Sequence, residues 1–130
     1  MSTVTGYEVT LLELLLEYFE RSDRGEDASI TLPYTNIEKC FLQLNETYDG
    51  AKIYLISPDL FELIKYSDKF EYSQEPQHKS INGRRFTLYG VLYDAVIIVD
   101  SSLYGHNYIW FANRIQESTN TFLKHKLIIS

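Results

Sequence analysis

The chain has 130 residues, 45% of them hydrophobic, with a net charge of −6 and one cysteine. This length and composition predict a single domain over residues 1–130 and exclude wholesale disorder, and the lone cysteine excludes an internal disulfide. No apolar stretch reaches about 18 residues, so no membrane partner is expected, and residues 1–20 lack the features of a signal peptide.

The acidic residues are concentrated at the start of the chain. Seven acids against two bases give residues 1–30 a net charge of −5, whereas eleven acids against ten bases give the other hundred residues −1. Nonspecific nucleic-acid binding needs clustered lysine or arginine to neutralise phosphates. The sequence has no such stripe, so we expect no direct nucleic-acid binding.

The first predicted helix covers residues 7–22, where leucines recur near the 3.6-residue spacing of an apolar helix face. Glu13, Glu17 and Glu20 fall on the opposite side. Such a run is typical of a solvated helix face, and its alternative is a docking face for a basic partner.

A second helix is predicted over residues 36–47. Thr35 and Glu38 have the spacing of a capping box, in which each side chain satisfies a free backbone N–H group. The apolar spacing places Cys40 against the core, where a thiol behaves as a small hydrophobic group rather than as a nucleophile.

The rest of the chain reads as strands with one short helix. Ser57 and Pro58 are typical of a helix start and follow a strand over residues 51–56. Residues 93–99 are the most apolar and predict a central strand, and Gly90 predicts a bulge or a close backbone approach. Further strands are predicted over residues 69–73, 84–89, 108–112 and 121–129.

Two polar connections are the expected contact sites, because loops on a rigid sheet often carry function. Residues 74–83 predict an exposed loop and residues 100–107 a turn-rich connection. Arg84 and Arg85 point to opposite faces of a strand, and one of them is a candidate for binding the acidic helix of a second copy. The residues expected to contact a protein partner are Glu13, Glu17, Glu20, His78, Arg84, Arg85, Tyr104 and Tyr108.

No catalytic, cofactor-binding or metal-binding residue is predicted. The three histidines lack the spacing of metal ligands. Asp100, Ser102 and His106 form a hydrolase triad only if the fold brings them within hydrogen-bond reach, and the serine lacks the glycine context of a nucleophile elbow.

Residues 35–113 resemble part of the tailed-phage major capsid proteins, namely the region near the capsomer centre. The likeness rests on two segments. In residues 53–60, a strand ends in Ser57 and Pro58 before a helix. In residues 83–103, a strand lies between Gly83 and Gly90 and a Val/Ile-rich strand follows it. The spine helix, N-terminal arm and extended loop of that family have no counterpart among the 130 residues.

The resemblance implies a non-enzymatic capsid-like or virion-associated protein, located in the virion or the host cytoplasm. Its partners would be copies of itself, as a homo-oligomer, or other virion proteins, and it would either join assembly or interfere with it. The alternative is a small acidic inhibitor of a host or defence protein, for example a mimic of nucleic-acid charge. The expected fold is α+β, a mostly antiparallel sheet of four to six strands with two or three helices packed on it.

Overall fold

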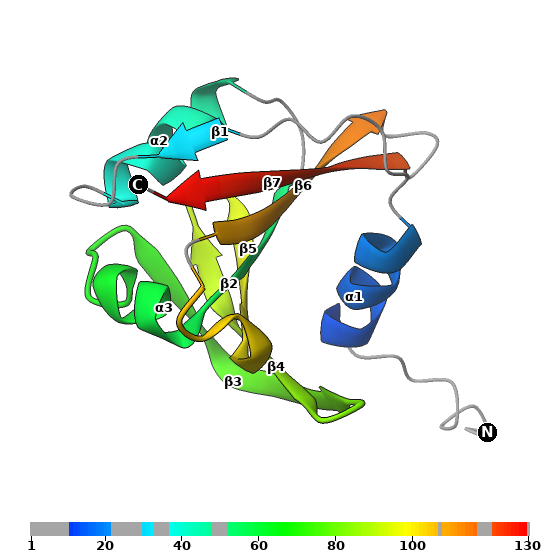
Figure 1. Cartoon of the computed structure of the whole chain (residues 1–130). Helices are drawn as coiled ribbons and strands as arrows, with labels where there is room; N and C mark the ends of the chain where they lie inside the picture. The colour runs from blue at the N-terminus through cyan, green and yellow to red at the C-terminus, as the bar shows by residue number, and fades with distance from the viewer. Residues whose placement is uncertain are drawn as a thin grey trace, which may run out of the picture.

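The computed structural model describes residues 11–21, 30–32, 37–47, 52–106, 108–116 and 121–129. These residues form one sheet with the strand order β1-β7-β6-β2-β5-β4-β3 (Figure 1). The strands are β1 (Ile30–Leu32), β2 (Lys52–Ile56), β3 (Phe70–Ile81), β4 (Arg84–Leu92), β5 (Ala95–Asp100), β6 (Tyr108–Gln116) and β7 (Thr121–Ile129). The helices are α1 (Leu11–Arg21), α2 (Ile37–Thr47), α3 (Pro58–Ile64) and the short 3₁₀ helix η3 (Ser101–Leu103).

The predicted α+β class is confirmed. The β2–β5 and β1–β7 pairs are parallel, and the four other strand pairs are antiparallel. Six strands have five or more residues, within the expected range, and the three-residue β1 adds a seventh at one edge of the sheet.

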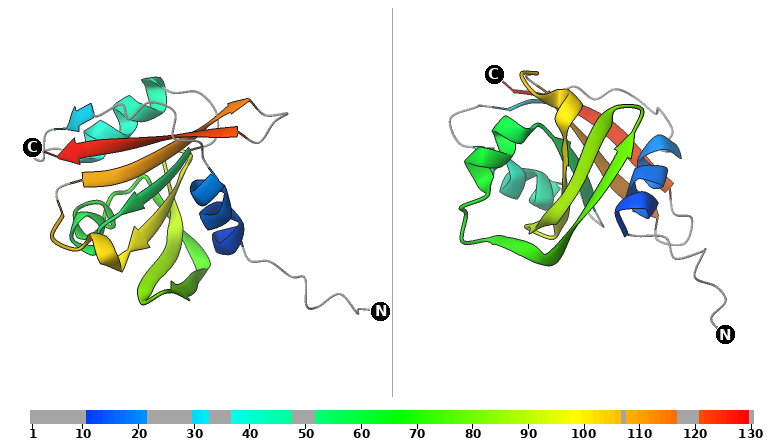
Figure 2. Two further views of the ribbon diagram at one scale, coloured as in Figure 1. Left: turned by 45° about the vertical axis from the view of Figure 1, so that its right-hand side comes forward. Right: turned by 90° about the horizontal axis from the view of Figure 1, so that it is seen from below.

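The sheet lies between α1 on one face and α2 and α3 on the other (Figure 2). Because side chains alternate along a strand, each face has its own core. On the α2–α3 face, the buried Tyr54 ring lies 4.7 Å from Phe41 and 4.9 Å from Phe111 between ring centroids. On the other face, Leu12 of α1 is fully buried in a cluster that includes Phe86. Since α1 contacts both β3 and β7, the sheet curls around this helix.

The helix predictions agree with the described residues. Cys40 is buried on α2 as expected, and burial raises the pKa of its thiol. Ser57 Oγ accepts a 3.2 Å hydrogen bond from Leu60 N, and Pro58 is the first residue of α3. The predicted capping residue Thr35 lies outside the described residues.

The prediction of a loop over residues 74–83 is wrong, because β3 continues to Ile81. Its pairing with β4 jumps from Tyr72–Gly90 to Gln77–Leu88, so residues 73–76 form a bulge. Pro76 has no N–H group to donate and is tolerated at such a bulge in an edge strand. The connection to β4 is only Asn82 and Gly83, whose positive φ angles of 50° and 81° suit a tight hairpin turn.

The predicted roles of Gly90 and of the apolar strand are confirmed, with one shifted boundary. A Cβ atom on Gly90 would lie 2.1 Å from the carbonyl oxygen of Glu71, so β3 and β4 approach closely there. β5 lies between β2 and β4 in the middle of the sheet. It begins at Ala95 rather than at residue 93, because Tyr93 and Asp94 have positive φ angles of 49° and 63° and form the preceding turn.

Candidate protein-interaction surface

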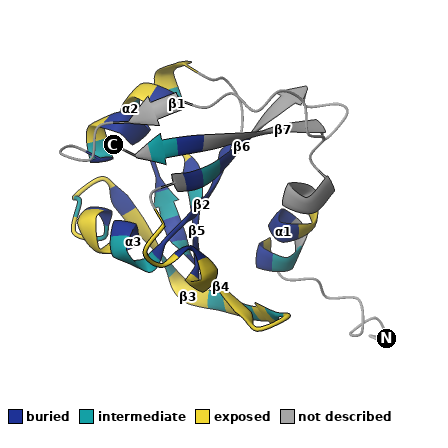
Figure 3. Cartoon of the chain, in the orientation of Figure 1, coloured by how far each residue is buried: buried dark blue, intermediate teal, exposed yellow. Residues whose placement is uncertain are grey.

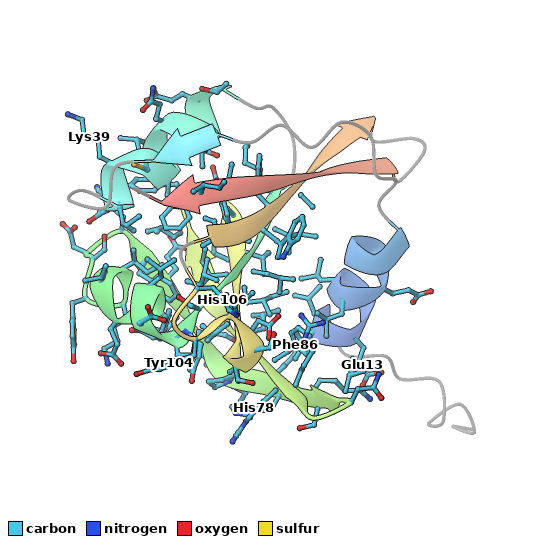
Figure 4. The ribbon with its side chains drawn as sticks, viewed as in Figure 1. Glu13, Lys39, His78, Phe86, Tyr104 and His106 are labelled. Atoms are coloured by element: carbon cyan, nitrogen blue, oxygen red, sulfur yellow. The ribbon has the colours of Figure 1, made fainter. Side chains whose placement is uncertain are left out.

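Four of the predicted contact residues come together at one end of the molecule. We call this region the hairpin end and define it as residues 77–85 of the β3–β4 hairpin together with residues 100–104. Figure 4 places His78 and Tyr104 at this end, beside Glu13 of α1, and Lys39 far from it. Figure 3 colours much of the hairpin as exposed. Tyr104 is 71% exposed.

A buried carboxylate holds the hairpin end to the end of β5. Asp100 is fully buried and forms an ion pair with Arg84, whose side chain is 48% exposed. The other carboxylate oxygen accepts hydrogen bonds from Ser102 N at 2.9 Å and from Ser102 Oγ at 2.8 Å. Arg84 Nε also donates to Ser102 Oγ at 3.1 Å. Every polar contact of this carboxylate therefore ties β4 or η3 to the last residue of β5.

These contacts lie where the pairing between β4 and β5 ends. Asp100 is the last β5 residue to pair with β4, opposite Phe86, so β4 continues beyond its partner strand. η3 replaces the missing strand there, because Ser101 Oγ accepts a 2.9 Å hydrogen bond from Arg85 N. The Arg84 guanidinium also lies 4.9 Å from the centroid of the Phe86 ring. The hairpin end is therefore a braced strand pair rather than the loop expected from sequence.

The contacts of Ser102 differ from those of a hydrolase triad. Its hydroxyl donates directly to Asp100 and accepts from Arg84, whereas a triad places a histidine between serine and aspartate. The backbone N–H of His106 donates to Leu103 O at 3.0 Å. These bonds brace η3 and give the serine oxygen a cation as a neighbour in place of a general base.

Arg85 and His78 lie on the face of the hairpin that is opposite to Arg84. Arg85 pairs with Ser80, and His78 pairs with Thr87, so all four side chains are on one face. His78 Nδ1 lies 3.1 Å from the hydroxyl oxygen of Thr87. Within the described part of the chain, no acid lies within ion-pair distance of the exposed Arg85 side chain. Arg85 is therefore the cation of the hairpin end that is most accessible to an acidic partner.

The hairpin has a charge opposite to that of the rest of the chain. Residues 76–93 contain Lys79, Arg84 and Arg85 and no acid, a net charge of +3. The other residues contain nine bases and all eighteen acids, a net charge of −9. Sequence reasoning did not single out this contrast, although the chain's charges alone are enough to find it.

The acidic residues of α1 meet this cationic hairpin within the same chain. Glu13 Oε1 lies 3.8 Å from Lys79 Nζ, with both side chains about two-fifths exposed. Gln77 Oε1 accepts a 2.8 Å hydrogen bond from Leu12 N, one of the free N–H groups at the start of the helix. Glu17 is exposed on the same helix. The side chains of the predicted contact residues Glu20 and Tyr108 lie outside the described residues.

A second exposed group was not predicted and surrounds the end of α3. Leu63, Tyr66 and Tyr72 are 51%, 83% and 52% exposed. Tyr72 donates a 2.7 Å hydrogen bond to Lys65 O, and its ring centroid lies 4.5 Å from that of Phe70. Desolvation raises the pKa of the Tyr72 phenol. Only the tertiary structure shows this group, because its members come from a helix, a turn and β3.

Glu38 of α2 fixes the turn before β5. Its Oε1 accepts hydrogen bonds from Ser67 Oγ at 2.6 Å and from the Tyr93 hydroxyl at 2.9 Å. Desolvation and then the bond to Glu38 raise the pKa of Tyr93. Because this carboxylate is satisfied by two neutral donors, its role is to connect α2 to the loops at this end of the sheet.

Among the described residues, no group of three or more His, Cys, Asp or Glu side chains is placed to hold a metal ion. No described helix is both long and apolar enough to cross a membrane.

Comparisons of the chain with known protein families, curated proteins and solved structures gave no match.

Proposed function

We propose that this chain is a non-enzymatic structural protein, capsid-like or virion-associated, that acts through contacts with copies of itself or with other virion proteins. The observation that carries the proposal is the acid-free hairpin of charge +3 on a chain whose other residues sum to −9. Outside this hairpin a neighbouring copy carries eighteen acids and nine bases, so the charges of two copies are complementary.

The bracing of the hairpin end supports the same function. A contact surface that is already rigid loses less conformational entropy on binding than a flexible loop does. Asp100 and Ser102 hold Arg84 next to the hairpin turn, while Arg85 and Tyr104 stay exposed beside it. Tyrosine and arginine are the residue types that most often dominate interface energies. The sequence resemblance to capsid proteins gives this self-association its proposed setting, in the virion or the host cytoplasm.

The test is the size of the assembly formed by the purified protein. We expect light scattering to detect oligomers whose mass falls at high ionic strength, because exposed charge pairs are screened by salt. Arg85→Glu reverses the most accessible cation of the hairpin end and should reduce the assembled fraction. Lys39→Glu makes the same charge change on α2, far from the hairpin end, and is the matched control (Figure 4).

Electron microscopy of any assembly then distinguishes the forms of this proposal. Rings or shells would support the capsid-like reading. A protein that stays monomeric at every concentration and captures one other protein would overturn it in favour of the acidic inhibitor.

A further inference from the structure

β3 is an edge strand with unusual length and a divided charge. It is the last strand in the sheet order, and of the described strands only β4 pairs with it. Its twelve residues form two regular runs, 70–72 and 77–81, on either side of the bulge. No other described strand pairs with the backbone groups that face away from β4, and such an edge is a site for pairing with another chain.

The two runs of β3 carry opposite charges. Glu71 and Glu75 precede Pro76, whereas Lys79 follows it. Two copies of β3 that pair antiparallel bring the first run of each strand against the second run of the other. The strand is therefore complementary to itself, as a two-fold contact requires.

The charges also favour one register for this pairing. A two-fold axis at Glu75 places Glu71 opposite Lys79 of the second copy, twice by symmetry, and Tyr72 opposite His78. The two Glu75 residues meet only at the bulge, outside the regularly paired runs. An axis at Ser73 would oppose Glu71 to Glu75, and an axis at Lys79 would oppose two lysines. Like charges directly opposite each other destabilise a strand pair, so both of these registers are disfavoured.

The side-chain directions agree with the register at Glu75. Lys79 pairs with Phe86, whose side chain belongs to the core on the α1 face. Phe70 pairs with Leu92 and belongs to the core on the other face, so its neighbour Glu71 points to the α1 face. Glu71 and Lys79 therefore project from the same side of the combined sheet and can meet across the axis.

The bulge falls at the axis, where it interrupts the pairing least. Pro76 cannot donate a ladder hydrogen bond, and an axis at Gln77 would place this proline opposite His78 inside a paired run. With the axis at Glu75, the runs 70–72 and 78–80 pair on either side and the bulge residues stay between them. Lys79 remains accessible, since its side chain is 41% exposed and its contact with Glu13 is at 3.8 Å.

We infer that two copies of the chain join through their β3 edges about this axis, with Glu71 of each copy opposite Lys79 of the other. The inference rests on the proposed self-association and names one contact by which it occurs. The combined sheet continues through the interface, so the contact does not require either copy to refold.

The test uses charge reversal and mixing, measured by sedimentation velocity. Glu71→Lys and Lys79→Glu each create two like-charged pairs in a two-fold dimer, so each variant alone should dimerise about tenfold more weakly than the wild type. An equimolar mixture of the two variants should recover the dimer, because a heterodimer opposes lysine to glutamate at both positions. The double variant E71K/K79E should recover it too, and Lys39→Glu should dimerise like the wild type.

Recovery on mixing supports the β3 contact, since a general loss of stability in either variant would not be repaired by the other. Wild-type assembly that is insensitive to both reversals would overturn this inference and leave the proposed function standing, as would weakening without recovery. A wild type that is monomeric throughout would overturn both.

Discussion

Arg84 forms an ion pair with the fully buried Asp100. We therefore expect substitution of Arg84 alone to destabilise the protein, and an additional substitution of Asp100 to restore part of the lost stability. Arg84→Met keeps the length of the side chain and removes its charge. The Asp100 carboxylate is then left at 0% exposure with only the two donors of Ser102. We expect the free energy of unfolding to fall by about 3 kcal/mol, the lower end of the range for removing one partner of a buried pair.

Asp100→Asn should be milder, because the remaining Arg84 side chain is 48% exposed and can be solvated. The amide still accepts a hydrogen bond from Ser102, so the expected loss is about 1–2 kcal/mol. In the double variant R84M/D100N no charge stays buried at this site. Its loss should be close to that of Asp100→Asn alone, which corresponds to a coupling energy of about 3 kcal/mol, the full loss expected for Arg84→Met.

Urea denaturation of the four proteins measures these differences from the shift in midpoint at constant slope. Arg85→Met is the control, since this neighbouring side chain is exposed, and its effect should stay within about 0.5 kcal/mol. The reasoning is refuted if the losses of the two single substitutions simply add in the double variant. A loss for Arg84→Met as small as that of the control would refute it as well.

Two further predictions concern the backbone of the hairpin and a tyrosine. Gly90→Ala places a methyl group 2.1 Å from Glu71 O and should lower the free energy of unfolding by at least about 3 kcal/mol or prevent folding. Gly83→Ala meets no atom within 4 Å and should lower it by about 1–2 kcal/mol, because of the positive φ at this position. Thermal unfolding compares the two variants, and equal losses of stability would contradict the steric account. Because the folded-state pKa of Tyr93 is raised, its stabilising contribution is complete below the unfolded pKa and is lost as pH rises through the folded pKa. Stability should therefore fall in alkaline solution above about pH 10 and fall less in Tyr93→Phe, which lacks the ionisable group; parallel pH profiles of the two proteins would contradict this cause.

Local signals in the sequence were enough to predict the helices and most strands. Ser57 and Pro58 determine the start of α3 through their own side chains, so no distant residue is needed to recognise it. Cys40 was placed in the core from spacing alone, because a helix repeats its faces every 3.6 residues.

The second half of β3 could not be predicted in this way. Its Pro, His, Lys and Ser residues have the composition of a loop, and pairing with β4 rather than local preference makes them a strand. The geometry of the candidate site likewise depends on contacts between distant residues. His78, Arg84, Arg85 and Tyr104 were named from their residue types, but the contact of Arg84 with Asp100, sixteen residues away, depends on tertiary pairing.

The central claim, that the protein works by contact with copies of itself, is tested most directly by its mass in solution. Multi-angle light scattering of the wild type over a wide concentration series should give dimers and larger species that grow with concentration and shrink in high salt. A mass of 15.2 kDa, that of one chain, at every concentration and ionic strength would contradict the claim.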